Sequence, residues 1–430
     1  MRARIEWPVI VLACCMLQAG IGSAQTLVEP PPAAATTQNP ASARYFPSSP
    51  KIEGQSNESR PPEKADDGPL FPGQTRAPYH ASVPVQRVTI TDKLTRPWSV
   101  ALLPDGRYLV TEKAGTLRIV GKDGALSDPI TGVPAVQVAN QGGLLDVALD
   151  PGFASNRRLF FTFTQPRSAA TSSIAVARAT LNEAKQALQG VKVIYRVQPA
   201  APLAQSAQQG SRIAMAPDGT LFVTIGDRSG RGPWQTAQDM TTAMGKIIHI
   251  TASGAPARGN PFAKTRGVLP EIWSSGHRNP QAIAFDANGQ LWEVEHGPQG
   301  GDELNRIEKG RNYGWPVIVH GIDYTLLPIG AGITAKEGLE QPLYYWDPVI
   351  APSGVAFYSG KLIPQWNGSV LIAALRGQQI SRLTLADGKV AAEEPLFGEA
   401  DLRFRDVRVD PDGAVIALTE DGKLLRIVPR

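Results

Sequence analysis

The sequence predicts an all-β fold, and three observations support this prediction. A tight-turn motif recurs six times, each copy leads into alternating apolar and polar residues, and the one candidate amphipathic helix, around 181–188, is short. Repeated β units at this scale are typical of propellers and solenoids, whereas βα repeats would need helices. We therefore expect a six-bladed β-propeller over residues 85–430.

Proline, aspartate and glycine define the clearest copies of the turn. Proline presets the first corner, aspartate can bond the backbone two residues on, and glycine takes the left-handed position. Length alone would also fit seven or eight blades of ~40–50 residues, so the number of copies decides. The remaining residues are expected in long loops such as 228–244 and 319–346. The clear copies lie at 103–106, 216–219 and 410–413, and the weaker ones at 149–152, 285–289 and 353–360.

The N-terminus has the features of an export signal. Two arginines precede an apolar run at 7–17, and small residues follow at 22–24, so we expect a signal peptide over 1–24 and a periplasmic or secreted product. A lipoprotein cleavage site at 11–14 is a weaker match. Both cysteines, Cys14 and Cys15, fall inside the signal, so the mature chain would hold no disulfide.

Residues 25–84 are rich in Pro, Ala, Ser, Thr and Gln and show no apolar period. Such a segment cannot offset its ordering entropy by burial, so we expect a disordered linker. No later stretch reaches the ~18 apolar residues of a transmembrane span. The net charge of +4 over 430 residues, without a Lys/Arg run, favours a slightly basic surface over nucleic-acid binding.

Unusual loop residues are densest in residues 271–316, a pattern that often marks function. Gly297 and Pro298 can present backbone carbonyls, and Asp302 and Glu303 add carboxylates on the same loop. Hard oxygen donors of this kind suit Ca²⁺, and a solvated acidic turn is the alternative. The five histidines are too scattered for a histidine metal centre.

A second set of candidate residues is cationic: Arg278 beside Asn279, then Arg376, Arg403 and Arg405. Alternation along an extended segment places Arg403 and Arg405 on one side, where two guanidinium groups could hold carboxylates through paired hydrogen bonds. If these arginines converge, they imply a small anionic ligand. Otherwise they are unrelated surface charges.

The stretch IWSSGHRNPQAIAFDANGQLWEVEHGPQGGDELNRIEKGRNYGWP, residues 272–316, resembles the signature of the soluble pyrroloquinoline-quinone (PQQ)-dependent glucose/sorbosone (aldose) dehydrogenases. Shorter matching segments follow the family's order, and together they extend the resemblance over about 88–428. These segments are Asn140–Leu145, Gly210–Arg212, Met244–Lys246, Ala351–Gly354 and Arg403–Asp406.

The resemblance implies a six-bladed propeller that binds PQQ over its channel mouth. It implies hydride transfer from the anomeric carbon of an aldose sugar to the quinone, giving the lactone, with electrons passed to a periplasmic acceptor. Carried over by position, Arg278 and Asn279 would contact the quinone oxygens, and Arg278 would also be catalytic. The other cofactor contacts would be Gln141, Arg403, Arg405 and Arg376, the last standing where relatives have a lysine.

Two Ca²⁺ ions are implied by the same resemblance. Gly297 and Pro298 would offer carbonyls to the Ca²⁺ that polarises the quinone, and Glu303 and Tyr313 would bind a second, structural Ca²⁺. A quinone that accepts hydride needs a Lewis acid on its oxygen, and a tricarboxylate needs guanidinium groups.

One position departs from the family pattern. Relatives carry a histidine, the general base, four residues before Arg212, where this chain has Gln208 with Ala207 beside it in place of an acidic residue. A glutamine amide takes up no proton near neutral pH, so the family mechanism would lose roughly 10² to 10⁴ in rate unless another group substitutes. Asp227 and His296 are the local candidates.

Two alternatives to a working dehydrogenase stay open. In the first, the propeller has lost catalysis and serves as a binding module for a carbohydrate, an anion or a protein. In the second, it is a Ca²⁺-dependent lactone hydrolase, an idea that rests on fold analogy alone.

Overall fold

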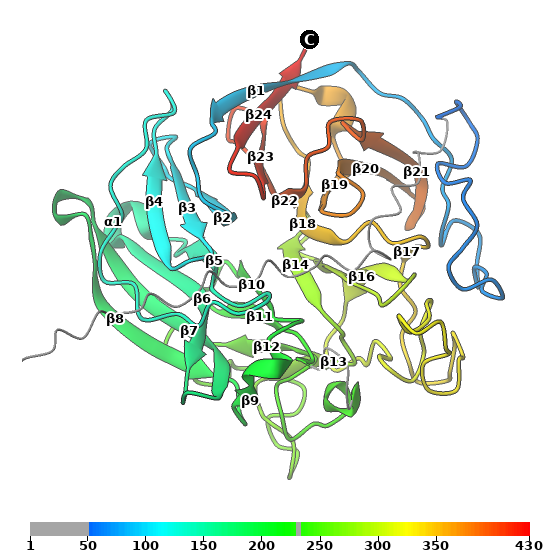
Figure 1. Cartoon of the computed structure of the whole chain (residues 1–430), viewed down its shortest axis with the longest axis horizontal. Coiled ribbons are helices and arrows are strands. Elements are labelled where there is room, and N and C mark those ends of the chain that lie inside the picture. The colour runs from blue at the N-terminus through cyan, green and yellow to red at the C-terminus, as the bar shows by residue number, and fades with distance from the viewer. Residues whose placement is uncertain (1–50, 229–233) are drawn as a thin grey trace, which may run out of the picture. The chain divides into compact units, whose positions relative to one another are not determined.

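The computed structural model describes residues 51–228 and 234–430, and it confirms the six-bladed β-propeller (Figure 1). Six antiparallel sheets surround a central axis, and neighbouring innermost strands contact one another around the ring. These innermost strands are β2 (Pro97–Leu102), β5 (Leu144–Leu149), β10 (Gly210–Met215), β14 (Pro280–Phe285), β18 (Pro352–Phe357) and β22 (Phe404–Val409).

The other strands follow outward within each blade. Blade 1 adds β3 (Tyr108–Glu112) and β4 (Thr116–Val120), and blade 2 adds β6 (Arg158–Pro166), β7 (Thr171–Asn182), β8 (Ala187–Arg196) and the short β9 (Ala201–Pro202). Blade 3 adds β11 (Leu221–Ile225), β12 (Lys246–Ile250) and β13 (Ile272–Ser275), and blade 4 adds β15 (Leu291–Glu295), β16 (Asp302–Ile307) and β17 (Tyr344–Trp346). Blade 5 adds β19 (Val370–Ala374), β20 (Gln379–Ala386) and β21 (Lys389–Leu396), and blade 6 adds β23 (Val415–Thr419), β24 (Leu424–Pro429) and β1 (Val85–Thr91).

Helical structure in the described ranges is limited to single turns. The α-helical turn is α1 (Phe153–Asn156), and the 3₁₀ turns are Glu183–Lys185, Leu203–Gln205, Trp234–Ala237 and Pro364–Trp366. None of these helices is long and apolar enough to cross a membrane.

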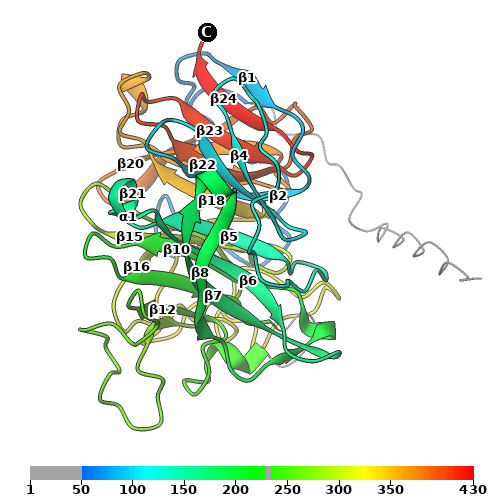
Figure 2. The same ribbon diagram turned by 90° about the vertical axis from the view of Figure 1, so that its left-hand side faces the viewer.

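Blade 6 closes the ring with strands from both ends of the propeller. β1 pairs antiparallel with β24, and Val85 lies opposite Pro429. This pairing covers an edge that would otherwise be open and ties the first strand to the last. Figure 2 shows the sheets stacked side by side, with β1 and β24 adjacent at the top.

Five of the six copies have the same place in their blades, because each joins the innermost strand to the second one, whereas residues 353–357 of the copy at 353–360 belong to β18 itself. In the three clear copies Gly106, Gly219 and Gly413 have φ values of 83°, 82° and 95°, as the turn chemistry requires. Because the innermost strands all run the same way, these turns share one face of the ring. The loops that lead into the innermost strands therefore meet on the opposite face, which we call the channel mouth.

A buried arginine joins all six blades at the centre of the ring. Arg212, from blade 3, is 1% exposed. Its side chain is 3.2 Å from one carboxylate and 3.1 Å from another, donates to two carbonyl oxygens at 2.9 and 2.7 Å, and lies 4.2 Å from an indole ring. These partners are Asp146 of blade 2, Asp406 of blade 6, the carbonyls of Gln281 of blade 4 and Ser353 of blade 5, and Trp98 of blade 1. A buried charge this well paired has its desolvation offset.

Residues 51–84 differ from the expected linker, since they are ordered against blades 4 and 5 (blue in Figure 1). The amide of Ala77 donates to the Tyr344 hydroxyl at 3.0 Å, and the amide of Ser82 donates to Glu394 at 2.9 Å. Composition could not reveal this, because the propeller rather than the segment supplies the partners. We call residues 51–84 the N-terminal strap. The rest of the expected linker, 25–50, and the expected signal peptide, 1–24, lie outside the described residues.

The candidate helix at 181–188 is the turn of the hairpin between β7 and β8. Leu181 and Leu188 pair across that hairpin, and both are buried in the apolar core between blades 1 and 2. Their spacing therefore reflects two strands that bury one residue each, rather than one face of a helix.

Candidate functional site

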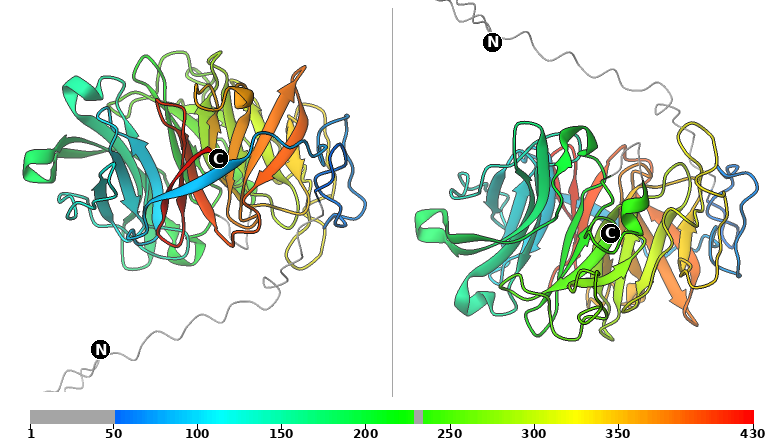
Figure 3. Two further views of the ribbon diagram at one scale, coloured as in Figure 1. Left: turned by 90° about the horizontal axis from the view of Figure 1, so that it is seen from above. Right: turned by 90° about the horizontal axis from the view of Figure 1, so that it is seen from below.

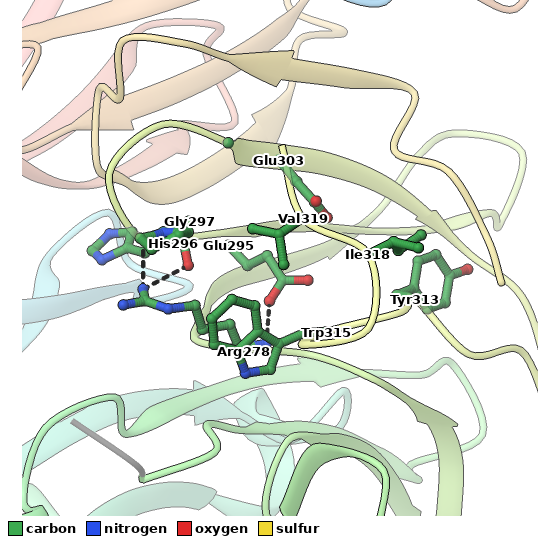
Figure 4. Close-up of a pocket in the computed structure, with 11 residues that line it drawn as sticks. Arg278, Glu295, His296, Gly297, Glu303, Tyr313, Trp315, Ile318 and Val319 are labelled. Carbon is green, nitrogen blue, oxygen red and sulfur yellow. Dashed lines mark hydrogen bonds between the residues drawn. The ribbon is translucent and has the colours of Figure 1, made fainter. Parts of the chain in front are cut away.

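Arg278 is the central side chain of the predicted site. It leads into β14, and its Nη1 donates to the carbonyl oxygens of His296 at 3.0 Å and of Gly297 at 2.5 Å (Figure 4). Its guanidinium carbon lies 5.2 Å from the centre of the Trp315 ring. The arginine thus fixes the loop that carries Gly297 and Pro298, and these residues line one pocket together.

Three loops from blades 2, 3 and 4 meet beside Arg278. The amide of Gln208 donates to Gln141 Oε1 at 2.7 Å, and the amide of Gly210 donates to Asn279 Oδ1 at 3.1 Å. Gln208 is 5% exposed and has a φ of 49°. The structure therefore brings together, at the channel mouth, the loops that carry Gln141, Gln208 and Asn279.

Arg403 and Arg405 also converge, because both bind Glu420. Arg403 Nε donates to this carboxylate at 2.7 Å, and Arg405 pairs with its other oxygen. Burial opposes ionisation of Glu420, yet the charges of Arg405 and Arg403 outweigh it and lower the pKa of Glu420 to about 2. Sequence reasoning missed Glu420, although Thr419-Glu420 repeats the Thr111-Glu112 pair of blade 1.

Gln281, which sequence reasoning also missed, connects the two groups of residues. Arg405 Nη1 donates to Gln281 Oε1 at 3.2 Å, and Gln281 Nε2 donates to Asn279 Oδ1 at 3.0 Å. Arg376 lies at the surface next to these residues. Its side chain is exposed, and the carbonyl of its neighbour Leu375 accepts a hydrogen bond from Arg403.

Lys113 adds a further cation to the mouth. Its Nζ donates to the carbonyl of Asn140 at 2.5 Å, next to Gln141. Burial, followed by the charges of Arg96 and Arg405, lowers the pKa of Lys113 to about 8. The mouth therefore has an excess of positive charge, which suits an anionic ligand.

A cluster of carboxylates borders the pocket, and two of its members, Glu295 and Glu303, line it. Glu303 of β16 stands opposite Glu295 of β15, and Asn305 Nδ2 donates to Glu303 at 3.0 Å and to Glu293 at 3.2 Å. Burial, followed by the charge of Glu295, raises the pKa of both Glu293 and Glu303. Among the described residues, Glu293 Oε1 and Asn305 Oδ1 are buried without a hydrogen-bond partner.

This cluster has the donor set of a hard cation. Potential ligand atoms of His277, Glu293 and Glu295 lie within 4.8 Å of one another. The Tyr313 ring stacks on His277 at 4.9 Å, but its hydroxyl donates to the Arg306 carbonyl at 2.6 Å and so is turned away. The sequence did signal these acids, since Glu293 and Glu295 alternate on β15, but it could not show that they are buried together.

The two alternative bases lie close to Arg278 as well. His296 Nδ1 is 3.2 Å from Asn279 Nδ2, and burial, followed by the charges of Arg405 and Arg278, lowers the pKa of His296 to about 3. Asp227 accepts a hydrogen bond from Trp315 Nε1 at 2.8 Å, and its amide donates to the Arg278 carbonyl at 2.9 Å.

A six-bladed propeller with a cationic mouth and an adjacent acidic cluster defines the class of this protein. The family model described as Glucose / Sorbosone dehydrogenase matches residues 94–426, so the chain belongs to that family, as the sequence predicted.

Individual relatives agree with this family. Aldose sugar dehydrogenase YliI of Escherichia coli (strain K12) is 36% identical over 358 residues, which cover 82% of this chain and 95% of that protein. The crystal structure of the soluble aldose sugar dehydrogenase from Escherichia coli in the apo-form matches with a TM-score of 0.76 and 36% identity, covering 81% of this chain and 100% of that one. The PQQ-bound aldose sugar dehydrogenase from Streptomyces coelicolor matches with a TM-score of 0.66 and 29% identity, covering 81% and 100%.

Proposed function

We propose that the chain is an exported, PQQ- and Ca²⁺-dependent sugar dehydrogenase that takes hydride from the anomeric carbon of an aldose, gives the lactone and passes electrons to a periplasmic acceptor. The convergence of Arg278, Asn279 and Arg405 at the channel mouth supports this most directly. The family, and relatives whose names specify aldose sugars and PQQ, support it independently.

The residues at the mouth fit a quinone with three carboxylates. Arg403 and Arg405 share one carboxylate, Glu420, so they retain capacity for further anionic partners. Guanidinium groups bind carboxylates through two parallel hydrogen bonds, which fixes orientation as well as adding affinity. Gln141, Asn279 and Arg376 complete the proposed contacts. When bound, PQQ supplies the two-electron acceptor.

The proposed roles of this chain's own residues are to bind, to orient and to exclude water. Arg278, stacked on Trp315 and tied to the Gly297 carbonyl, would hold its guanidinium toward the quinone oxygens. The carbonyls of Gly297 and Pro298 are suited to the Ca²⁺ that polarises the quinone. Gln208 can accept a hydrogen bond from a sugar hydroxyl, but it cannot remove the proton.

Proton removal from the sugar hydroxyl needs an acceptor. With Gln208 in the base position and the pKa of His296 at about 3, neither group is an efficient proton acceptor in the unliganded site. This observation favours a second candidate function: a propeller that retains the cofactor site but serves as a binding module for a carbohydrate, an anion or a protein.

A second, structural Ca²⁺ would fit the acidic cluster at the pocket. Glu303, with Glu293 and Glu295, would supply carboxylates, and the unpartnered oxygens of Glu293 and Asn305 are the donors that such a cation needs. Tyr313 would contribute to this Ca²⁺ site through the stacking of its ring on His277, because its hydroxyl is hydrogen-bonded to the Arg306 carbonyl.

Titration of the purified full chain with PQQ, with and without Ca²⁺, tests the cofactor assignment, and dye reduction with a panel of aldoses tests turnover. Tight, Ca²⁺-dependent PQQ binding with dye reduction is the expected result. Binding without reduction of dye by any aldose would favour the binding module, and undetectable binding would refute the cofactor assignment.

A further inference from the structure

The N-terminal strap is bound to the back of the loop that carries Gly297 and Pro298. Gln299 of that loop donates from Nε2 to the Glu63 carboxylate at 2.5 Å. The amides of Glu63 and Lys64 donate to the two carboxylate oxygens of Asp347 at 2.8 and 3.1 Å. The strap therefore reaches the predicted Ca²⁺ loop directly and through Asp347.

Two buried strap side chains hold the neighbouring segment, which also lines the pocket. Lys64, 5% exposed, donates from Nζ to the Val319 carbonyl at 3.4 Å and to the Gly332 carbonyl at 3.0 Å. Asp67 Oδ2 lies 3.0 Å from His320 Nδ1, and these side chains are 2% and 1% exposed. Both views of Figure 3 show the strap (blue) beside the loop that contains these partners (yellow).

The segments that the strap binds pack tightly against the 297–303 loop. Gln299 and Ile322 exchange backbone hydrogen bonds of 3.0 and 2.8 Å. A Cβ placed on Gly301 would lie 2.6 Å from the His320 carbonyl oxygen, and one on Gly300 would lie 2.9 Å from the Asp347 side chain. A shift of His320 or Asp347 must therefore move the loop.

We propose that the N-terminal strap is a positioning element for the cofactor site, in which Glu63, Lys64 and Asp67 hold the 297–303 loop in place. The inference rests on the proposed function, because that loop would offer the Gly297 and Pro298 carbonyls to Ca²⁺. The strap precedes the family-model match, which begins at residue 94, so this chain supports its site with residues outside the matched region. Groups that orient metal ligands typically change metal affinity ten- to a hundredfold when removed.

The test compares three full-length variants. Asp67→Ala removes the His320 partner, Asp67→Asn keeps a hydrogen-bond acceptor of the same shape, and Ser82→Ala is the matched control. Ser82 also belongs to the strap, but its hydroxyl donates to Glu394 at 2.7 Å and accepts from Trp366 at 2.8 Å, away from the 297–303 loop.

Hydrogen exchange of the apo-proteins is the first readout, since it needs no cofactor. Asp67→Ala is expected to speed exchange of the Gln299, Gly301 and Ile322 amides by about tenfold, the effect of losing one charge-assisted hydrogen bond. Asp67→Asn should recover most of the protection, and Ser82→Ala should leave these amides unchanged. Equal exchange in Asp67→Ala and wild type would overturn the inference, and so would equal acceleration in Ser82→Ala.

Calcium-dependent PQQ affinity is the second readout. Asp67→Ala is expected to weaken PQQ binding about tenfold and to leave the turnover of the fully loaded protein unchanged. A lower turnover at saturating PQQ with unchanged affinity would contradict a positioning role. If wild type itself binds no PQQ, the proposed function fails, whereas the positioning of the loop by the strap is still decided by exchange.

Discussion

Replacing Gln208 with histidine should supply a proton acceptor at the proposed base position. The backbone at this position has a φ of 49°, a region that histidine enters more readily than most residues. The hydrogen bond that the backbone N–H of Gln208 donates to Gln141 Oε1 does not depend on the Gln208 side chain. The backbone should therefore stay in place. General base catalysis contributes roughly 10² to 10⁴ in rate, or about 3–5 kcal/mol of barrier, and this is the expected gain in kcat.

Steady-state dye reduction at saturating PQQ and Ca²⁺, measured from pH 5 to pH 9, would check this prediction. The gain should appear as the imidazole loses its proton near pH ~6.5 and should vanish in acid. Gln208→Asn is the matched control, because asparagine also tolerates a positive φ and holds no proton. Affinity for PQQ should not change. A rate for Gln208→His equal to that of wild type across the pH range would refute the assignment of the base position.

Three further predictions follow from the site and the ring. Arg278→Lys should weaken PQQ binding by about 10–100-fold in an equilibrium titration, because a lysine loses the planar fork and the stacking on Trp315. Glu293→Gln should raise the Tm of the Ca²⁺-free protein by relieving carboxylate repulsion and should reduce the Ca²⁺-induced rise in Tm; an unchanged Ca²⁺ response would remove Glu293 from the ligand set. Because the pKa of Glu420 is lowered from 4.5 to about 2, its ionised form stabilises the fold above pH 4.5, so the stability difference between wild type and Glu420→Gln in denaturant titrations should shrink as pH falls toward 2.

The fold could be predicted from the sequence because the blades of a propeller repeat the same turn chemistry. Each blade needs a tight turn after its innermost strand, and only a few residue types make that turn, so counting copies counted blades. The weaker copies at 149–152 and 285–289 mark the same turn, whereas residues 353–357 of the copy at 353–360 belong to β18, and the loop that follows this strand is longer.

The site was predictable only where residues act at fixed positions in sequence. Arg278, Asn279 and Gly297 could be predicted because their motif is contiguous. Glu420, by contrast, acts through Arg403 and Arg405 on the neighbouring strand of its own blade, and Gln281 acts through Arg405 of another blade. The prediction of a disordered linker was wrong for residues 51–84 for a related reason. The composition of this segment is that of a chain unable to bury itself, and its order comes from Asp347, His320 and Tyr344 on the propeller. The composition of a segment describes its own residues, but it does not show which binding partners the rest of the fold provides.

Arg212 affects how the propeller unfolds. Repeat proteins whose units contact only their neighbours can lose units one at a time from an end. Here all six blades contact one guanidinium. The departure of any of blades 2 to 6 therefore leaves a buried charge or carbonyl without its partner, and the departure of blade 1 removes the Trp98 ring from Arg212. The ring is therefore expected to unfold as a single cooperative unit despite its repeated architecture.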